Sequence, residues 1–432
     1  MQVGTPEFAR FYRKKLDFFK WYTFTDFCFG SITLFNVYWF NVNGLSIADI
    51  FLLGLIGMAV AMVFQNIMSV VSDKLNRRFP LLVAALVTQG ISLLFSAWFP
   101  SFTGFVLYII IWFTLSGESQ RTLVQYALIK LAREVPHTSN EDDLSSQFSR
   151  YRVFGSMGTA ASLPLWGWFI ESVNEFFGQP RVNGHVGYQV QLTISAIAFF
   201  LLALVLVAGM TDFWRHEHAY LQLVDGMDSS TIHKSRTIDL LKNGAFLSIL
   251  VPQMIFMTGF SIGSGVLDVF FKGLGASLVF LAITRAIGAV AELPLFFASA
   301  AMERRAGVSS SLMLSYAFFA AKLAIYFWFM DDALLWLAIV LESLSSFGIR
   351  WPAVTSALQR ITTAHKSLAL TILLTVENVF TLIGSMLGFF ISTTSGGTDL
   401  AFKSLFLVAL LLTGASTAMV LLFTMRKHRE RA

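Results

Sequence analysis

The sequence is poor in charged residues, which make up 13% of its 432 residues, whereas an average soluble domain has roughly 25%. Hydrophobic residues make up 56% of the chain, and the mean hydropathy is +0.67. Apolar blocks of about twenty residues, the length of a membrane-crossing helix, recur from end to end. This composition argues against a soluble enzyme, a nucleic-acid-binding protein and a disulfide scaffold. It indicates a multi-pass integral membrane protein.

Residues and motifs for covalent or metal chemistry are also scarce. The single cysteine, Cys28, lies inside the first apolar block and allows neither an internal disulfide nor a multi-thiolate metal site. The sequence has no Gly-Lys-Ser/Thr phosphate-binding loop and no His-Glu-x-x-His zinc pattern. We therefore expect no catalytic residue, no metal and no cofactor, and a protein that is not an enzyme. The N-terminus resembles a retained first span more than a cleavable signal.

A window of about nineteen residues predicts an all-α membrane protein with twelve transmembrane helices in two bundles. The first six spans are 17–41, 45–71, 79–98, 102–131, 151–172 and 187–211. The last six are 244–270, 276–301, 309–330, 333–360, 367–391 and 400–425. The predicted domains are accordingly an N-terminal bundle (1–211), a linker (212–243) and a C-terminal bundle (244–432).

Lysine and arginine are distributed unevenly between the two sides of these spans. Segments on the N-terminal side of the membrane hold 24 of the 31 basic residues, while the opposite loops hold only Arg181, Lys272 and Lys403. Basic residues favour the cytoplasmic side. We therefore predict that both termini and the linker are cytoplasmic. The net charge of +5 then reflects topology, and we expect no nucleic-acid partner.

An acid followed by basic residues connects the second and third spans. The segment reads Ser69-Val70-Val71-Ser72-Asp73-Lys74-Leu75-Asn76-Arg77-Arg78. It resembles the loop motif of the major facilitator superfamily, with Ser69 and Asn76 in place of two glycines. A degenerate copy, Glu303-Arg304-Arg305-Ala306-Gly307, follows the eighth span. The resemblance implies the major facilitator fold, alternating access between two bundles, and a gating role for Asp73, Lys74, Arg77 and Arg78.

The fifth span opens with a second signature, Arg150-Tyr151-Arg152-Val153-Phe154-Gly155-Ser156-Met157-Gly158. It is similar to the start of helix 5 in the oligosaccharide–proton symporters (the lactose and sucrose permease group) and, in shorter form, in the nucleoside permeases. Gly155 and Gly158 would let a neighbouring helix approach closely. The resemblance implies that Arg152 grips solute hydroxyls.

Charged residues inside the predicted spans are functional candidates, because a charge at mid-bilayer is costly. The candidates are Asp26, Glu118, Arg121, Asp268, Arg285, Glu292, Lys322, Glu342, Arg350 and Glu377. All seven histidines lie in predicted loops, so proton coupling would require a carboxylate. The alternative for each residue is a structural ion pair that holds helices together.

The symporter resemblance assigns roles to several of these residues. Glu292 aligns with a sugar-binding glutamate of helix 8, Lys322 lies near a helix 9 arginine, and Asp268 lies near a helix 7 aspartate. The pattern also departs from the family: Gln125 replaces a helix 4 acid, and Ser345 and Gly348 stand where that family has its coupling histidine and glutamate. Galactoside specificity therefore does not carry over.

The predicted sites combine these assignments. Glu118, Arg121 and Gln125 share one helix face; Glu118 could neutralise Arg121, or Arg121 could face a solute. The predicted substrate-binding residues are Arg121, Gln125, Arg152, Glu292, Trp21 and Tyr22. The predicted proton-coupling residues are Glu292, Lys322, Asp268, Asp26 and Glu118. Glu292 is the carboxylate we expect to be essential, with Lys322 as its possible counter-charge.

The sequence thus predicts a secondary active transporter that imports a polar organic solute by proton symport. A sugar or oligosaccharide is the first candidate solute. The alternatives are a nucleoside–proton symporter, a drug or siderophore exporter, and a membrane scaffold or sensor without transport. We expect a monomer in a bacterial inner (plasma) membrane, with the small-molecule solute, H⁺ and the lipid bilayer as its partners.

Overall fold

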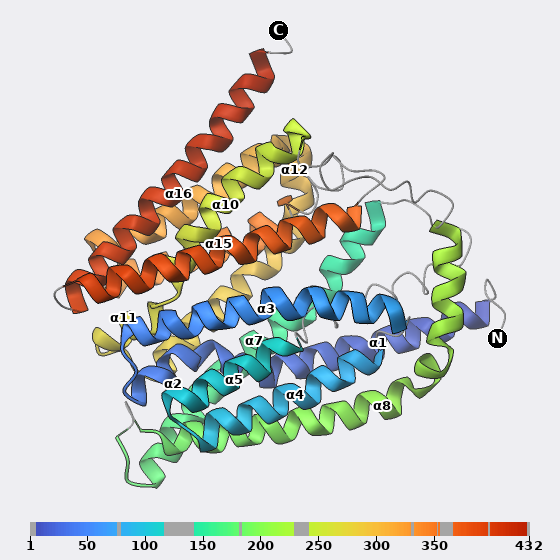
Figure 1. The fold of residues 1–432 in the computed structure, drawn as a ribbon, viewed down its shortest axis with the longest axis horizontal. Helices are drawn as coiled ribbons and strands as arrows, with labels where there is room; N and C mark the ends of the chain where they lie inside the picture. The colour runs from blue at the N-terminus through green and yellow to red at the C-terminus, as the bar shows by residue number, and fades with distance from the viewer. Residues whose placement is uncertain are drawn as a thin grey trace. The chain divides into compact units, whose positions relative to one another are not determined.

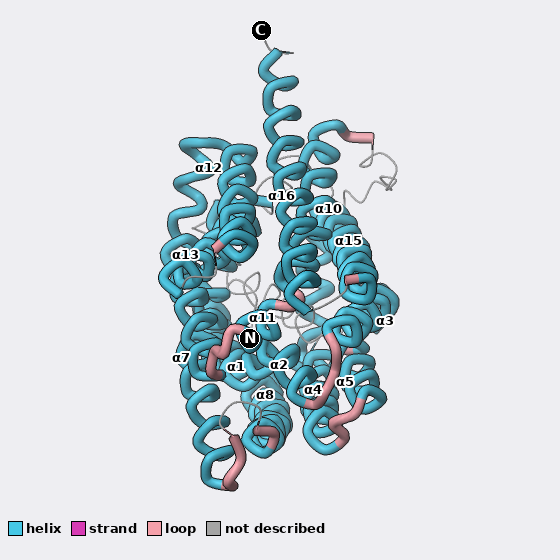
Figure 2. Tube along the Cα trace, turned by 90° about the vertical axis from the view of Figure 1, so that its left-hand side faces the viewer, coloured by secondary structure: helices cyan, strands magenta, loops and turns pink. Residues whose placement is uncertain are grey.

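The computed structural model describes most of the chain. The described residues are 6–75, 79–115, 142–180, 184–228, 242–329, 332–351, 353–354, 366–395 and 398–429. Within these ranges every regular element is a helix, and no strand occurs (Figures 1 and 2). The prediction of an all-α protein is confirmed for this part of the chain.

The first half of the chain contributes eight helical segments. They are α1 (Pro6–Gly30), the 3₁₀ turn η1 (Ser31–Phe35), α2 (Asn36–Val42), α3 (Ile47–Leu75), α4 (Phe79–Trp98), α5 (Phe102–Thr114), α7 (Asp142–Phe176) and α8 (Val186–Asp228). Helix α8 continues beyond the predicted membrane boundary at residue 211, so the first part of the predicted linker is helical.

Among the described residues, the second half of the chain forms seven helical segments. They are α10 (Gly244–Ser264), α11 (Leu267–Gly273), α12 (Leu278–Trp328), α13 (Asp332–Ser343), the π-helical turn η3 (Leu344–Arg350), α15 (Lys366–Thr394) and α16 (Thr398–Arg429). Side-chain caps begin two of these helices. Asn243 Oδ1 accepts from the first backbone N–H groups of α10, and Ser277 Oγ accepts from Phe280 N of α12.

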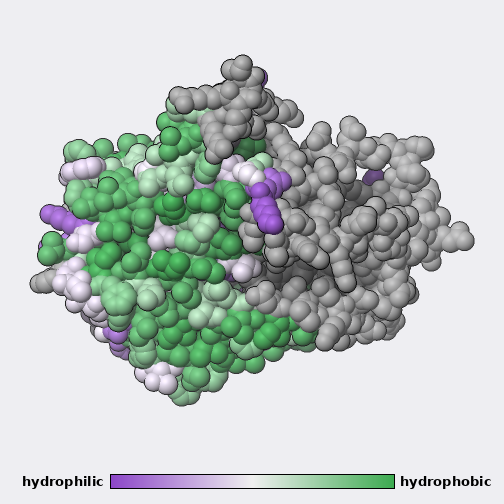
Figure 3. Space-filling view, turned by 45° about the horizontal axis from the view of Figure 1, so that its top comes forward, coloured by the Kyte–Doolittle hydropathy of each residue, from purple (hydrophilic) through white to green (hydrophobic). Residues whose placement is uncertain are grey.

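Where the predicted spans are described, they fall on a helix or on consecutive helical segments; residues 116–131 of the fourth span and residues 352 and 355–360 of the tenth lie outside the described residues. Among the described residues, eight stretches are long and apolar enough to cross a membrane, and α5 is a shorter apolar helix. On the face shown in Figure 3, apolar residues cover most of the described surface, as expected for a protein in contact with lipid.

Three predicted spans are interrupted in the structure. The first breaks at η1, where Ser31 and Thr33 hydroxyls bond to the carbonyls of Cys28 and Gly30 and compete with the α-helical pattern. The seventh breaks between α10 and α11. The tenth changes from α to π geometry at η3.

The eighth and ninth spans are joined almost directly. They form the single run α12, which turns at Gly307, where φ is 81° and ψ is 161°. A residue with a Cβ rarely adopts this backbone conformation. The glycine of the second copy of the loop motif therefore makes the turn between the two spans.

The chain forms two compact units. The first contains Met1–Asn36 and Ala59–Ile232, and the second contains Val37–Met58 and His233–Ala432. The second unit takes in α2 and the start of α3, because Phe51 packs against Gly265 and Gly388 and Lys272 Nζ donates to Asn41 Oδ1 at 2.8 Å. The domain boundaries at 211 and 244 stay a prediction.

In the first unit, α1 packs along α7 and α4 packs along α8. A Cβ on Gly158 would collide with the backbone carbonyl of Phe24, and one on Gly155 would lie 3.0 Å from the ring of Phe27. Ser31 Oγ of η1 and Ser162 Oγ of α7 lie 2.9 Å apart. The predicted close approach at the two glycines is confirmed.

Candidate functional site

Four charged residues of the second unit form two ion pairs, which we call the charge cluster: Asp268, Arg285, Lys322 and Glu342. Arg285 Nη2 donates to Asp268 Oδ1 at 2.5 Å. Lys322 Nζ lies 2.7 Å from Glu342 Oε1. The two pairs also interact electrostatically with each other. The cluster unites side chains from α11, both limbs of α12, and α13.

Each pair has one buried and one partly exposed member. The side chains of Asp268 and Lys322 are 2% and 0% exposed, whereas those of Arg285 and Glu342 are 31% and 29% exposed. The partly exposed side chains are therefore those of an arginine and a glutamate. Such groups donate to and accept from hydroxyl groups, and the buried partners hold them in place.

Neighbouring groups complete the surroundings of the Lys322–Glu342 pair. Ser264 Oγ donates to Glu342 Oε1 at 3.3 Å. The Lys322 ammonium lies 4.7 Å from the ring centroid of Phe319 and 5.6 Å from that of Tyr326. Aromatic faces attract a desolvated cation. The buried lysine is thus held by one carboxylate and two rings.

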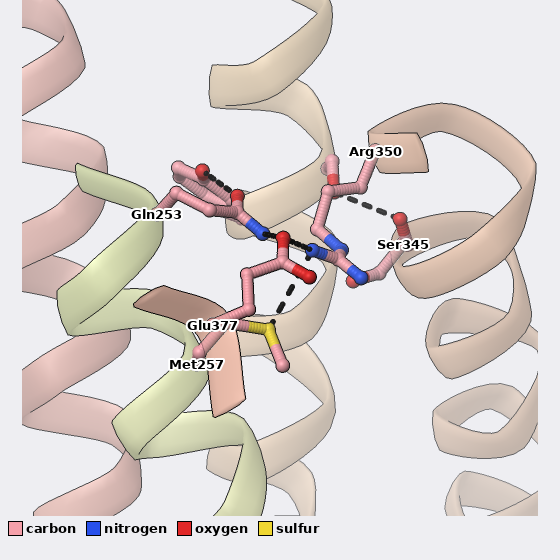
Figure 4. Close-up of polar contacts among 7 residues, drawn as sticks. Gln253, Met257, Ser345, Arg350 and Glu377 are labelled. Atoms are coloured by element: carbon pink, nitrogen blue, oxygen red, sulfur yellow. Dashed lines mark hydrogen bonds and ion pairs between the residues drawn. The ribbon is translucent and has the colours of Figure 1, made fainter. Parts of the chain in front are cut away.

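A second group of polar side chains, which we call the polar chain, runs through Tyr316, Gln253, Glu377 and Arg350; Figure 4 labels the last three. Tyr316 OH donates to Gln253 Oε1 at 2.7 Å, and Gln253 Nε2 donates to Glu377 Oε1 at 2.6 Å. Arg350 Nη1 donates to the same carboxylate oxygen at 3.0 Å and to Met257 Sδ at 3.5 Å.

All four members of the polar chain are buried. The Arg350 guanidinium also lies 5.5 Å from the ring centroid of Phe256 and 5.9 Å from that of Trp351. The chain connects α10, α12 and α15 to η3. Its polar atoms bond to one another inside the helix packing, so it crosslinks helices and differs in character from the partly exposed charge cluster.

Two predicted coupling residues, Asp268 and Lys322, lie in the charge cluster. Asp268 pairs with Arg285, and Lys322 forms its ion pair with Glu342, whereas the sequence suggested Glu292 as its partner. Glu292 itself is half-buried on α12. The structure therefore adds Arg285 and Glu342 to the site.

The predicted residues on α1 lie within or beside the packing of the first unit. Asp26 and Tyr22 are buried, and the ring of Tyr22 lies 5.0 Å from that of Phe19. Trp21 is 65% exposed and makes edge contacts with Phe24 and Phe154. Their roles in solute binding and proton coupling stay predictions.

The structure does not describe the side chains of the remaining predicted residues. Glu118, Arg121, Gln125, Arg77 and Arg78 lie outside the described residues. For Asp73, Lys74 and Arg152 only the helical backbone is described. Their assigned roles stay predictions.

The polar chain includes two residues that the sequence reasoning missed. Arg350 and Glu377 were recognised as intramembrane charges, but Gln253 and Tyr316 were not singled out. An amide in the middle of an apolar span was the available signal, because a buried amide requires partners. Among the described residues, no group of three or more His, Cys, Asp or Glu side chains could hold a metal ion.

Comparison with known proteins gives one family and one fold. Residues 20–426 match the MFS_1 like family. No curated protein shows significant sequence similarity to the chain.

Several solved structures are similar over their full length. A mutant of the nucleoside transporter NupG has a TM-score of 0.70 and 16% identity, covering 94% of this chain and 98% of that one. A bacterial homolog of the human lysosomal transporter Spinster has a TM-score of 0.66 and 13% identity, and the match covers 98% of each chain. A D-xylose–proton symporter has a TM-score of 0.64 and 15% identity, and the match covers 95% of this chain and 97% of that one. The chain therefore has the fold of the major facilitator transporters.

Proposed function

Since the chain belongs to the MFS_1 like family of membrane transporters, we propose that it is a secondary active transporter for a polar organic solute, driven by protons through alternating access. The first candidate solute is a sugar or oligosaccharide. The observation that supports the proposal is the charge cluster, in which the side chains of Arg285 and Glu342 are partly exposed beside buried partners of opposite charge.

The composition of the cluster favours an uncharged, hydroxyl-rich solute. Two acids and two bases give the cluster no formal net charge, so a charged solute would add an unbalanced charge at that depth. Arg285 presents a planar donor fork, and Glu342 presents carboxylate acceptors. Together they match the alternating donors and acceptors of neighbouring hydroxyl groups.

Proton coupling requires a carboxylate that exchanges one partner for another. Glu342 has two such options: the Lys322 ammonium at 2.7 Å, or a proton when solute or rearrangement separates the pair. Solute binding then changes the affinity for the proton by the same factor by which protonation changes the affinity for the solute. Glu292, Asp268 and Asp26 remain proposed contributors, and Arg152, Arg121 and Gln125 remain proposed solute-binding residues.

Nucleoside–proton symport is the second candidate. It is supported by the similarity of the fold to the nucleoside transporter NupG, and a ribose presents the same kind of hydroxyl pair to Arg285 and Glu342. We propose the bacterial inner membrane as its location, with a single chain as the functional unit.

Solute counterflow in proteoliposomes tests both candidates. Vesicles preloaded with unlabelled mono- and disaccharides, or with nucleosides, are diluted into the labelled compound, with and without an inward proton gradient. We expect counterflow of one class with or without the gradient. We expect net uphill uptake of that class, into vesicles without internal solute, only with the gradient. Arg285→Gln should abolish counterflow, whereas Lys403→Gln, at an exposed position on α16, serves as the matched control. Absence of counterflow by both classes would refute the proposal.

A further inference from the structure

The π-helical turn η3 begins two residues after Glu342 and ends at Arg350. A π turn places one more residue in each turn than an α-helix does, and such turns occur mostly as isolated bulges at functional sites. Inserting one changes the direction of the side chains on one side of the turn relative to those on the other. The geometry of η3 therefore determines how Glu342 and Arg350 are oriented relative to each other.

Contacts from other elements hold this turn at both ends. Near its start, Ser315 Oγ of α12 donates to the carbonyl of Ser345 at 2.8 Å, and Lys322 pairs with Glu342 just before it. At its end, Arg350 donates to Glu377 of α15. The turn thus lies between the charge cluster and the polar chain.

The polar chain fixes Arg350 more rigidly than a single ion pair could. Glu377 Oε1 accepts hydrogen bonds from both Arg350 and Gln253, and the Gln253 amide is oriented in turn by Tyr316. All four residues are buried, so water does not substitute for a lost partner. Figure 4 shows the Arg350 guanidinium directed toward Glu377 and Met257.

From this arrangement we propose that Arg350 and Glu377, with Gln253 and Tyr316, are positioning residues that keep η3 in its π conformation and thereby orient Glu342 toward Lys322. The functional meaning of that orientation rests on the proposed function, which gives Glu342 a role in solute and proton binding. The orientation itself is a property of the fold. It can be measured without any solute.

A structural ion pair is the competing explanation, and an apolar double variant separates the two. Replacing both members of a buried ion pair with apolar residues of similar volume is often neutral for stability. If the pair only stabilises the helix packing, Arg350→Met together with Glu377→Leu should leave the position of residue 342 unchanged. If the pair positions η3, residue 342 should move even though the protein folds.

The experiment measures thiol accessibility at position 342. Because Cys28 is the only cysteine, Cys28→Ser gives a background in which Glu342→Cys is the sole thiol. Its rate of labelling by a charged maleimide in detergent is compared with and without the double replacement. Lys403→Cys, exposed on α16, is the control in the same backgrounds. We expect at least a threefold change at position 342 and none at position 403.

An unchanged labelling rate at position 342 would overturn the proposal. If the double variant does not elute as a monodisperse species, Glu377→Gln, which keeps the side-chain shape and removes the charge, replaces it under the same criterion. Failure to find a transported sugar or nucleoside would count against the proposed function alone. The labelling result would still decide the positioning role.

Discussion

The two members of the Lys322–Glu342 pair should contribute unequally to stability when removed one at a time. Lys322 is fully buried, whereas the Glu342 side chain is 29% exposed. Glu342→Gln leaves the ammonium of Lys322 inside the protein without a charged partner. Lys322→Met leaves the carboxylate of a partly exposed side chain, to which Ser264 still donates. The stability of each variant therefore depends on the surroundings of the group that remains.

The difference in exposure sets the expected loss in free energy of unfolding for each variant. Removing one member of a buried pair typically destabilises by about 3–5 kcal/mol. We expect about 3 kcal/mol for Glu342→Gln, because the new amide oxygen still accepts a hydrogen bond from Lys322. For Lys322→Met we expect about 1 kcal/mol, near the value for a solvated pair. The double variant, Lys322→Met with Glu342→Leu, should lie within about 1 kcal/mol of the native protein.

Equilibrium unfolding by SDS in lipid–detergent bicelles measures these differences. The ten tryptophans provide the fluorescence signal, and the native chain and the double variant serve as references for the two single variants. The reasoning predicts the order native, Lys322→Met, Glu342→Gln from most to least stable. Equal loss in the two single variants, or a larger loss for Lys322→Met, would refute the argument from exposure.

Four further predictions use other features of the chain. Gly158→Ala should lower stability by about 1–3 kcal/mol, because its Cβ would collide with the backbone of α1; Gly244→Ala, which meets nothing within 4 Å, should be neutral in the same unfolding assay. Asp268→Asn should reduce counterflow at least tenfold by releasing the arginine that it orients, and native counterflow would exclude a role for that pair. Glu292→Gln should abolish uphill accumulation of solute. Counterflow survives if Glu292 carries only protons and is lost if Glu292 binds the solute. Full accumulation by the variant would make Glu292 a structural residue. Asp73→Asn should change the transport rate of a correctly inserted protein, and an unchanged rate would make the loop motif a topological signal only.

The helical architecture could be predicted from hydropathy, since an apolar run of about twenty residues allows few alternatives in a bilayer. The contact at Gly158 could be predicted for a similar reason: small residues at helical spacing permit close approach, and the structure places Phe24 against that glycine. In both cases the sequence pattern and the physical constraint are local. Neither depends on how distant helices are rotated.

The pairing of the intramembrane charges could not be predicted in the same way. Which acid meets Lys322 depends on the depth and rotation of three spans, and hydropathy does not determine rotation about the helix axis. The π turn η3 adds one residue per turn close to Glu342, so helical spacing misjudges the directions beyond it. The polar chain was missed for the same reason, since Gln253 and Glu377 come from separate spans.

The ion pairs in the second unit also bear on how the chain enters the bilayer during synthesis. In sequence, Asp268 and Arg285 are 17 residues apart, and Lys322 and Glu342 are 20 residues apart. Arg350 and Glu377 are 27 residues apart. Each acid thus leaves the ribosome within about one span of its base, and a charge inserted alone costs about 2.5–3.5 kcal/mol at the centre of a helix. Neighbouring spans that leave the translocon together carry neutral pairs. The paired charges are thus shielded from lipid before the rest of the bundle has been made.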